Sequence, residues 1–359
     1  MKYIFITRFY DGAVCAKVLH RIARSMIYNV QTLRALAASL VVLTHLDAML
    51  IASGIGREHL AFGTSGVDLF FVISGFVIVY ATDGRALSPL RFFRDRLLRI
   101  VPLYWTLTLA VFVIALVAPD LLKSTTASLF DLFRSLLFVP YVKESGEIQP
   151  VLFLGWTLNY EMFFYAIFSA AMILKNSIYR VTLLTSVIAV LIIAGVFVAP
   201  LSTVSFFLTR PIMIEFVIGA WIGIAYVKGR RLSTPLAIAC LLGGFSVLIG
   251  RFWLWPGGER AWWGGLSAMA ILSGALSLPQ YRGKMLQLLG GASYSLYLLH
   301  PFVIIAATKI CIKLGLFDNT LSLIASAVFA FVSACAASIL SFMYFEKPVT
   351  LYIKKVARH

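Results

Sequence analysis

Residues 62–81 read FGTSGVDLFFVISGFVIVYA, twenty residues with one charged side chain, Asp68. At 1.5 Å per residue, a helix of this length spans about 30 Å, the thickness of the hydrocarbon core of a bilayer. The whole chain shares this character, because 61% of its residues are hydrophobic and 13% are charged. A water-soluble domain carries about 25% charged residues. The stretch therefore predicts a transmembrane helix in an integral membrane protein.

Similar apolar blocks follow one another along the chain, and most Pro and Gly residues lie near the breaks between them. The blocks predict ten transmembrane helices, at residues 30–51, 62–81, 100–118, 152–174, 180–199, 205–227, 235–251, 261–278, 291–313 and 321–345. No stretch alternates with the period of a strand for long enough to form a barrel, and no internal repeat is found. The expected fold class is all-α, a polytopic membrane bundle of about ten transmembrane helices.

The chain is strongly basic, with 31 Lys and Arg against 15 Asp and Glu and a formal net charge of +16. In a soluble protein this excess would suggest nucleic-acid binding. Counting end residues of the blocks with the connections, 21 of the 31 cations fall in alternate connections, 7 fall in the other connections, and 3 lie deeper inside the spans. Basic connections face the cytoplasm in membrane proteins. We therefore expect both termini in the cytoplasm and no nucleic-acid partner.

We divide the chain into a basic amphipathic N-terminal extension at 1–28, a membrane domain at 29–350 and a basic cytoplasmic tail at 351–359. The extension lacks the long apolar core of a secretory signal, and its helical spacing of apolar residues suits a short helix on the inner leaflet. A second interpretation stays open, in which synthesis begins at Met26 and the preceding stretch is not native. The four cysteines are scattered singly, which predicts no metal site and no disulfide framework.

Ionisable residues inside apolar blocks are costly in hydrocarbon and mark functional sites. The chain has nine of them, Arg34, His45, Asp47, Asp68, Glu161, Arg210, Glu215, His300 and Lys309. Their distances from the block ends place His45, Asp68, Glu161 and Glu215 at comparable depth on four different helices. Pairing among these groups is the least costly way to keep them in a membrane. His300 lies near mid-membrane, where a lone His also serves as a helix–helix hydrogen-bonding group.

The connection between the second and third blocks contains RFFRDRLLRIVP at residues 91–102. Arg96 and Arg99 are three residues apart and share one helical face beside the third block. Guanidinium groups bind phosphate in a bidentate manner, so this pair predicts a phosphate-rich ligand approached from the cytoplasm, with Arg34 joining from the first helix. The alternative is that the motif only marks the cytoplasmic side or binds anionic lipid.

These motifs together resemble the membrane acyltransferase-3 family, and within it the subgroup that O-acetylates bacterial exopolysaccharides. The segment from Arg34 to His45 is similar to the family's signature of an Arg, ten residues and a His. Further motifs are matched, in family order, at residues 66–76, 96–102, 156–165, 293–301 and 345–348. The chain departs from the family in its basic N-terminal extension. It also has no C-terminal esterase-like domain, which some relatives carry, and this leaves open whether it completes the transfer alone.

The resemblance implies an acyl-CoA donor, usually acetyl-CoA, no bound cofactor, and a hydroxyl of an envelope saccharide as acceptor. We expect His45 to act as the general base, with Asp68 or Glu161 orienting its ring. The residues expected to bind substrate are Arg34, Arg96, Arg99, Trp156 and His300. The expected location is the bacterial cytoplasmic membrane. The expected partners are acyl-CoA, a lipid-linked or polymeric saccharide and membrane lipids, with polysaccharide assembly proteins as a further candidate.

Three alternatives stay open. Direct transfer competes with an acetyl-histidine intermediate on His45. A proton-coupled transporter or flippase also uses intramembrane acids, His and Arg, although the chain shows no inverted repeat. A structural subunit of a polysaccharide assembly complex would use the same polar residues to hold its helices together.

Overall fold

The computed structural model describes residues 26–55, 60–122, 125–254 and 260–356. Within these residues the chain is a bundle of helices with no strand, and Val142 and Ile148 form an isolated bridge. This confirms the predicted all-α membrane bundle. Residues 1–25 of the predicted N-terminal extension lie outside the described residues.

The principal helices account for every predicted block. They are α2 (Tyr28–His45), α3 (Asp47–Ala52), α4 (Ser65–Thr82), α5 (Pro89–Val117), α6 (Leu129–Leu136), α7 (Trp156–Ala171), α8 (Ser177–Phe197), α9 (Thr203–Leu208), α10 (Ile214–Val227), α11 (Thr234–Leu254), α12 (Arg260–Ser277), α13 (Lys284–Gly291), α14 (Ser293–Lys313), α15 (Thr320–Ser341) and α16 (Lys347–Val356).

Of the described segments, six are long and apolar enough to cross a membrane by themselves. They are Tyr28–Ala52, Ala61–Thr82, Pro89–Val117, Ser177–Phe197, Ser293–Lys313 and Thr320–Val356. Pro211–Val227 and Thr234–Gly250 are shorter apolar helices. The predicted blocks are therefore all helical, and several of them are shorter than the hydrophobic core of a bilayer is thick.

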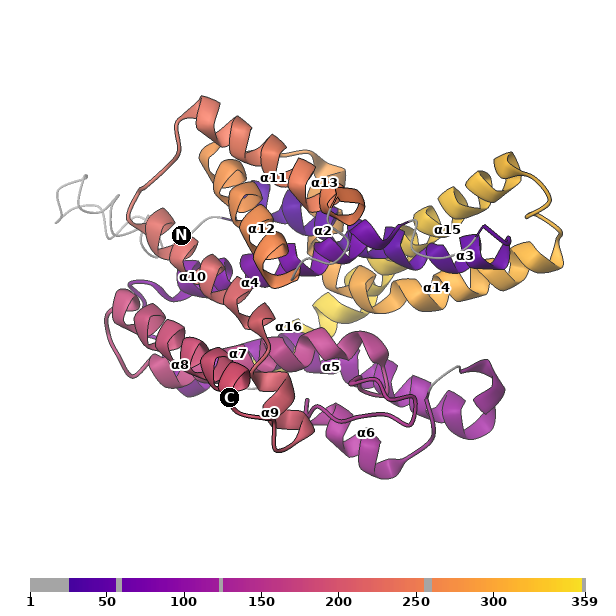
Figure 1. Ribbon diagram of the computed structural model, residues 1–359, viewed down its shortest axis with the longest axis horizontal. Coiled ribbons are helices and arrows are strands. Elements are labelled where there is room, and N and C mark those ends of the chain that lie inside the picture. Colours follow the sequence, from indigo (N-terminus) through magenta and orange to yellow (C-terminus); the bar gives the residue numbers. More distant parts are fainter. Residues whose placement is uncertain (1–25, 56–59, 123–124, 255–259, 357–359) are drawn as a thin grey trace, which may run out of the picture.

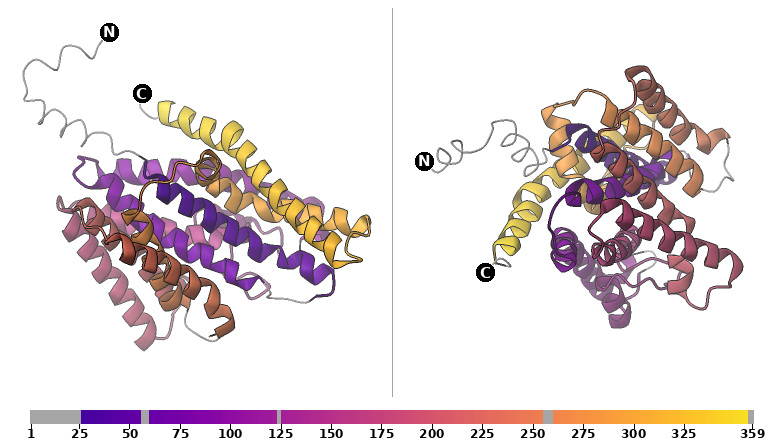
Figure 2. Two further views of the ribbon diagram at one scale, coloured as in Figure 1. Left: turned by 90° about the horizontal axis from the view of Figure 1, so that it is seen from above. Right: turned by 90° about the vertical axis from the view of Figure 1, so that its left-hand side faces the viewer.

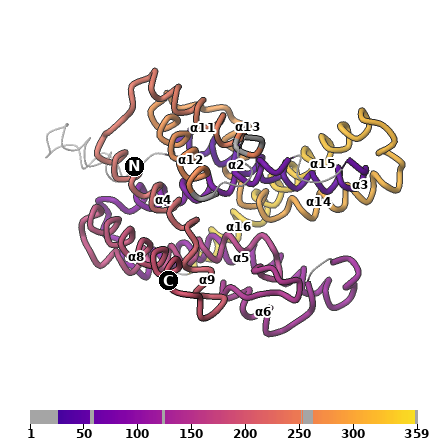
Figure 3. The backbone as a smooth tube through the Cα atoms, viewed as in Figure 1, coloured from indigo at the N-terminus to yellow at the C-terminus, as the bar shows by residue number. Residues whose placement is uncertain are grey.

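Helices α2 and α4 lie side by side and form the centre of the bundle (Figures 1 and 3). Helices α10 and α12 pack on α4, and α13 and α14 pack on α2. On the other side, α5 packs on α7, and α7 packs on α8. Figure 2 shows α15 and α16 as a long, nearly continuous rod along the bundle, joined by a π-helical turn at Phe342–Glu346.

The starts of some helices meet the ends of others, as alternating membrane spans require. Asn29 at the start of α2 donates a hydrogen bond from Nδ2 to the carbonyl of Ala275 in α12 at 2.7 Å. Its Oδ1 accepts from the backbone N–H of Tyr281, just beyond the end of α12, at 2.7 Å. At the end of α7, the Ser169 hydroxyl donates to the carbonyl of Pro89 at the start of α5. The Ala275 carbonyl belongs to the last turn of α12, where carbonyl groups lack partners inside the helix.

Helix α5 begins at Pro89 rather than at the predicted residue 100. Its first turn is capped by Ser88, whose hydroxyl accepts from the backbone N–H of Arg91 at 3.3 Å, and proline is favoured at the first helical position. The helix then continues through Pro102, which lies near the start of the predicted block at residue 100. The basic motif therefore lies on the same rigid helix that enters the membrane. In the loop that follows α5, a short helix forms at Leu129–Leu136.

The closest helix packing is between α4 and α10. A Cβ on Gly75 would lie 2.0 Å from the carbonyl oxygen of Phe216, and one on Gly219 would lie 1.9 Å from the carbonyl oxygen of Val72. Each glycine thus lies against the backbone of the other helix. Small residues that let backbones approach are typical of packing between membrane helices. This contact fixes α4, and α4 carries part of the polar cavity described below.

We predict that Gly219→Ala lowers the midpoint of thermal unfolding, because the added methyl group overlaps backbone that cannot move aside. Overpacking of this kind costs about 1–3 kcal/mol. The matched control is Gly243→Ala in α11, where a Cβ would have nothing within 4 Å. Alanine is the better helix former, so this variant should be neutral or slightly more stable. Equal midpoints for the two variants, measured by tryptophan fluorescence in detergent, would contradict the close packing.

Candidate functional site

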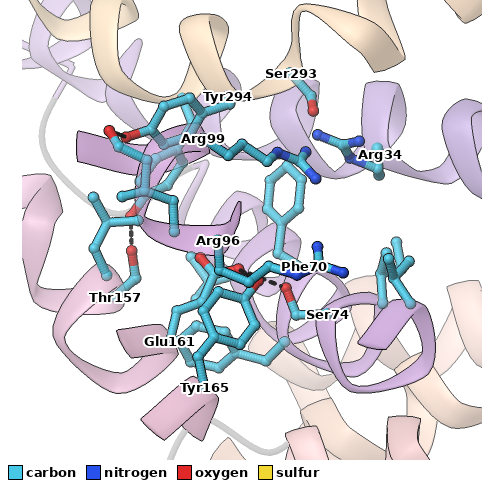
Figure 4. A pocket seen from close by; sticks show the side chains of 17 residues that line it. Arg34, Phe70, Ser74, Arg96, Arg99, Thr157, Glu161, Tyr165, Ser293 and Tyr294 are labelled. Atoms are coloured by element: carbon cyan, nitrogen blue, oxygen red, sulfur yellow. Dashed lines mark hydrogen bonds between the residues drawn. The ribbon is translucent and has the colours of Figure 1, made fainter. Parts of the chain in front are cut away.

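A cavity of about 100 Å³ lies inside the bundle, lined by residues of α2, α4, α5, α7 and α14. Polar residues that line it are Arg34, Ser74, Arg96, Arg99, Thr157, Glu161, Tyr165, Ser293, Tyr294 and Tyr297. Figure 4 shows these side chains gathered around one space. Because they come from five helices that are far apart in sequence, the bundle itself assembles the site.

Three arginines supply the positive charge of the cavity. Figure 4 shows the guanidinium groups of Arg34 and Arg99 pointing toward one another. The guanidinium carbon of Arg96 lies 5.4 Å from the ring centre of Phe92 and 5.6 Å from that of Tyr165. Both distances fall within the range of cation–π attraction, which fixes this side chain against the wall. Among the described residues, none of the three arginines forms an ion pair.

Glu161 lies with the arginines in this cavity. Its Oε1 accepts hydrogen bonds from the Ser74 hydroxyl at 2.9 Å and from the Tyr165 hydroxyl. Both donors line the same cavity (Figure 4). Two donors to one carboxylate oxygen fix the orientation of the group. The sequence placed Glu161 at the depth of His45, and the structure instead brings it next to the cations.

Glu346 is a second carboxylate near the arginines, and reasoning from the residues alone did not single it out. It is 7% exposed, and its Oε2 accepts from the Ser295 hydroxyl at 2.6 Å. Arg34 and Arg99 are its principal cationic neighbours. It belongs to the π-helical turn at Phe342–Glu346, a kind of irregularity that is frequent at functional sites. The sequence gives no signal for that turn, which aims Glu346 inward.

Ser293 is a further residue of the cavity; it begins the matched motif at 293–301, but no role was predicted for it from the sequence. Its side chain is fully buried, it lines the cavity, and its hydroxyl has no hydrogen-bond partner among the described residues. Buried hydroxyl groups usually have a partner. An unsatisfied hydroxyl beside three guanidinium groups therefore suits a ligand that accepts hydrogen bonds.

The two histidines are next to each other. His300 is fully buried on α14, and its Nε2 lies 3.1 Å from Nδ1 of His45 on α2. The ring centres are 4.7 Å apart in an edge-to-face arrangement. Tyr297 lines the arginine cavity, and its ring centre is 6.4 Å from that of His300. Tyr297 therefore connects the cavity with the histidine pair.

Asp68 and Trp156 lie elsewhere. A Cβ on Gly264 would be 2.6 Å from the Asp68 carboxyl carbon, so this fully buried carboxylate packs directly on α12. The structure does not place it among the hydrogen-bond partners of His45, which are the Val41 carbonyl and His300. Trp156 begins α7 and packs edge-to-face on Tyr160 at 6.1 Å, outside the set of cavity-lining residues.

Comparison with known proteins gives the same assignment as the sequence motifs. Residues 27–343 match the acyltransferase domain of the acyltransferase-3 family. The chain is also similar to the exopolysaccharide production protein ExoZ of Rhizobium meliloti (strain 1021), with 39% identity over 302 residues, which cover 81% of this chain and 91% of that protein. No solved structure matches the chain. Since the family match spans the bundle from α2 to the end of α15, the chain belongs to the acyltransferase-3 family of acyltransferases.

Proposed function

We propose that this acyltransferase moves an acetyl group from cytoplasmic acetyl-CoA to a hydroxyl of an envelope saccharide, in the bacterial cytoplasmic membrane. The observation that carries the proposal is the cavity in which Arg34, Arg96 and Arg99 face one space. Three guanidinium groups inside an apolar bundle call for an anionic ligand, and phosphate matches their geometry. The name of the related exopolysaccharide production protein supports a saccharide as the acceptor.

The size of the cavity limits how the donor binds. Pockets that enclose a drug-sized ligand measure about 300–1,000 Å³, and this cavity measures about 100 Å³. It therefore does not enclose a nucleotide. It suits a phosphate group and the thin pantetheine arm, with the nucleotide outside on the predicted cytoplasmic side. Ser293, with its unsatisfied hydroxyl, is a further donor for the phosphate or for an amide of the arm.

Helix α2 connects the donor site with the reaction site. Arg34 and His45 are eleven residues apart on this helix. Eleven residues span about 16 Å and bring the second residue within about 20° of the first around the helix axis. Both side chains therefore lie on the same side of α2. A donor held by its phosphates at Arg34 extends its thioester along this face toward His45.

His45 is the proposed general base. A sugar hydroxyl is a weak nucleophile, and imidazole accepts its proton near neutral pH. His45 Nε2 takes the hydroxyl proton while the hydroxyl oxygen attacks the thioester carbonyl carbon. The carbon–sulfur bond then breaks, and the proton passes from His45 to the sulfur of the departing CoA. An acetyl-histidine on the same nitrogen is the second route, and rapid-quench trapping without acceptor separates the two.

Direct assay separates the acyltransferase proposal from the transporter alternative. We expect membranes that contain the protein to transfer label from acetyl-CoA to the strain's exopolysaccharide. His45→Ala should lower this rate about 10²–10⁴-fold, the usual contribution of a general base. The matched control is Lys309→Ala, an exposed ionisable residue on α14 away from the cavity, which should stay close to wild type. Undiminished acetylation in His45→Ala would remove His45 from the chemistry.

The arginines are tested by their effect on donor binding. We expect Arg96→Ala with Arg99→Ala to raise the KM for acetyl-CoA at least about tenfold, because each lost charge-assisted hydrogen bond is worth about 1.5–3 kcal/mol. The KM for the saccharide should change little. Arg91→Ala is the control, since Arg91 is exposed on the first turn of the same helix and does not line the cavity. An unchanged donor KM in the double variant would contradict the phosphate assignment.

A further inference from the structure

The contacts of the two histidines identify which ring nitrogens carry protons. His45 Nδ1 lies 2.9 Å from the carbonyl oxygen of Val41, and His300 Nδ1 lies 2.9 Å from that of Leu296. A carbonyl oxygen can only accept a hydrogen bond. Each Nδ1 must therefore carry a proton and donate it to the carbonyl four residues earlier in its own helix.

The contact between the rings follows from this assignment. His300 Nε2 lies 3.1 Å from His45 Nδ1. With the proton of His300 on Nδ1, its Nε2 has a lone pair, and it accepts a hydrogen bond from the Nδ1–H of His45. That N–H is shared between Val41 and His300. The arrangement leaves Nε2 of His45 unprotonated, and no described residue forms a hydrogen bond with it.

We propose that His300 is a positioning residue for the acyl transfer: through its Nε2 it orients the His45 ring and stabilises the imidazolium that forms when His45 accepts the substrate proton. The inference rests on the proposed function and assigns to a neutral imidazole the role that a carboxylate has in a Ser–His–Asp triad. It differs from the sequence-based expectation, in which His300 binds substrate and Asp68 or Glu161 orients His45.

The location explains why a neutral partner suits this position. His300 is fully buried on α14, among residues that include Leu296 and Ile304. A carboxylate there would carry an unpaired charge whenever His45 is neutral, at a large desolvation cost. A neutral imidazole avoids that cost in the resting state. When His45 gains a proton, its Nδ1–H becomes a charged donor, and the hydrogen bond to His300 strengthens.

Two substitutions separate positioning from packing. His300→Phe keeps a ring of similar size and removes the acceptor, whereas His300→Gln keeps an acceptor oxygen near the place of Nε2. Displacing a catalytic group by about 1 Å can cost 10²-fold, so we expect His300→Phe to lower kcat about 100-fold and His300→Gln to stay within about tenfold of wild type. The KM values for acetyl-CoA and saccharide should stay within about twofold in both, since neither variant touches the arginines.

Several outcomes would overturn the proposal. If His300→Phe raised a KM and left kcat intact, His300 would bind substrate instead. If the Phe and Gln variants lost activity equally while remaining folded by size-exclusion chromatography, His300 would serve packing alone. If wild-type membranes transferred no label while the protein was folded, the proposed function would fail. Normal wild-type activity that is lost in His45→Ala but kept in His300→Phe would overturn the role of His300 alone.

A measurement on the wild-type protein removes the dependence on variants. Nitrogen-15 spectra of histidine-labelled protein distinguish N–H from bare ring nitrogens. We expect the His45 signals, identified by their absence in His45→Ala, to show a protonated Nδ1 and a bare Nε2. A bare Nδ1 on His45 would overturn the hydrogen bond on which the role of His300 depends, whatever the activity of the membranes.

Discussion

The absence of water in the hydrocarbon core is the constraint on which this structure depends. A polar group buried there must find its partner within the protein, and the backbone does so by forming helices. Side chains at the helix ends follow the same rule. Asn29 donates a hydrogen bond to the carbonyl of Ala275 and accepts one from the backbone N–H of Tyr281. In the middle of the bundle, buried polar side chains lie close together, because each needs a partner within the protein. Most of the bundle is apolar, and the polar groups that remain gather in the arginine cavity, around the histidine pair and against α12.

Single rigid helices carry residues of both the arginine cavity and the histidine pair, and so fix the distance between them. Helix α2 carries both Arg34 and His45, so the distance between the proposed anion site and the proposed reaction site is fixed by helix geometry rather than by a loop. Helix α14 likewise carries residues of both places, because Ser293 lines the cavity and His300 lies beside His45. The close backbone contact of α4 with α10 at Gly75 and Gly219 holds the third wall. A site built from helices in this way is more exact than one built from loops.

The sequence predicted the helices well and the neighbours of each side chain poorly. Apolar length and the breaks between blocks locate a helix whatever surrounds it, and depth along a helix follows from counting. Which helices touch does not follow from either. Asp68 shows the difference: Leu60 lies against Thr44, beside His45, whereas Gly66 lies against Ala37, so Asp68 is displaced from His45 along the helix, contrary to the prediction. It also lies about 200° around the helix from Gly66, against Gly264. Glu346 lies in the matched motif at 345–348, but no role was predicted for it, because the π-helical turn that directs it inward has no sequence signature.

Glu161 and Glu346 lie near the arginines rather than beside His45, the proposed base. Glu161 lines the cavity with the three arginines and is held by the Ser74 hydroxyl. Glu346 is held by the Ser295 hydroxyl and has Arg34 and Arg99 as neighbours. The two acids limit the net positive charge that must be kept in the membrane, and the arginines remain the proposed partners of the donor phosphate. A carboxylate bound to His45 would instead favour its protonated form at rest, and a protonated His45 accepts no proton. With Glu161 and Glu346 near the arginines and His300 beside His45, the arrangement suits the proposed role of His45 as a base that stays uncharged until an acceptor hydroxyl arrives.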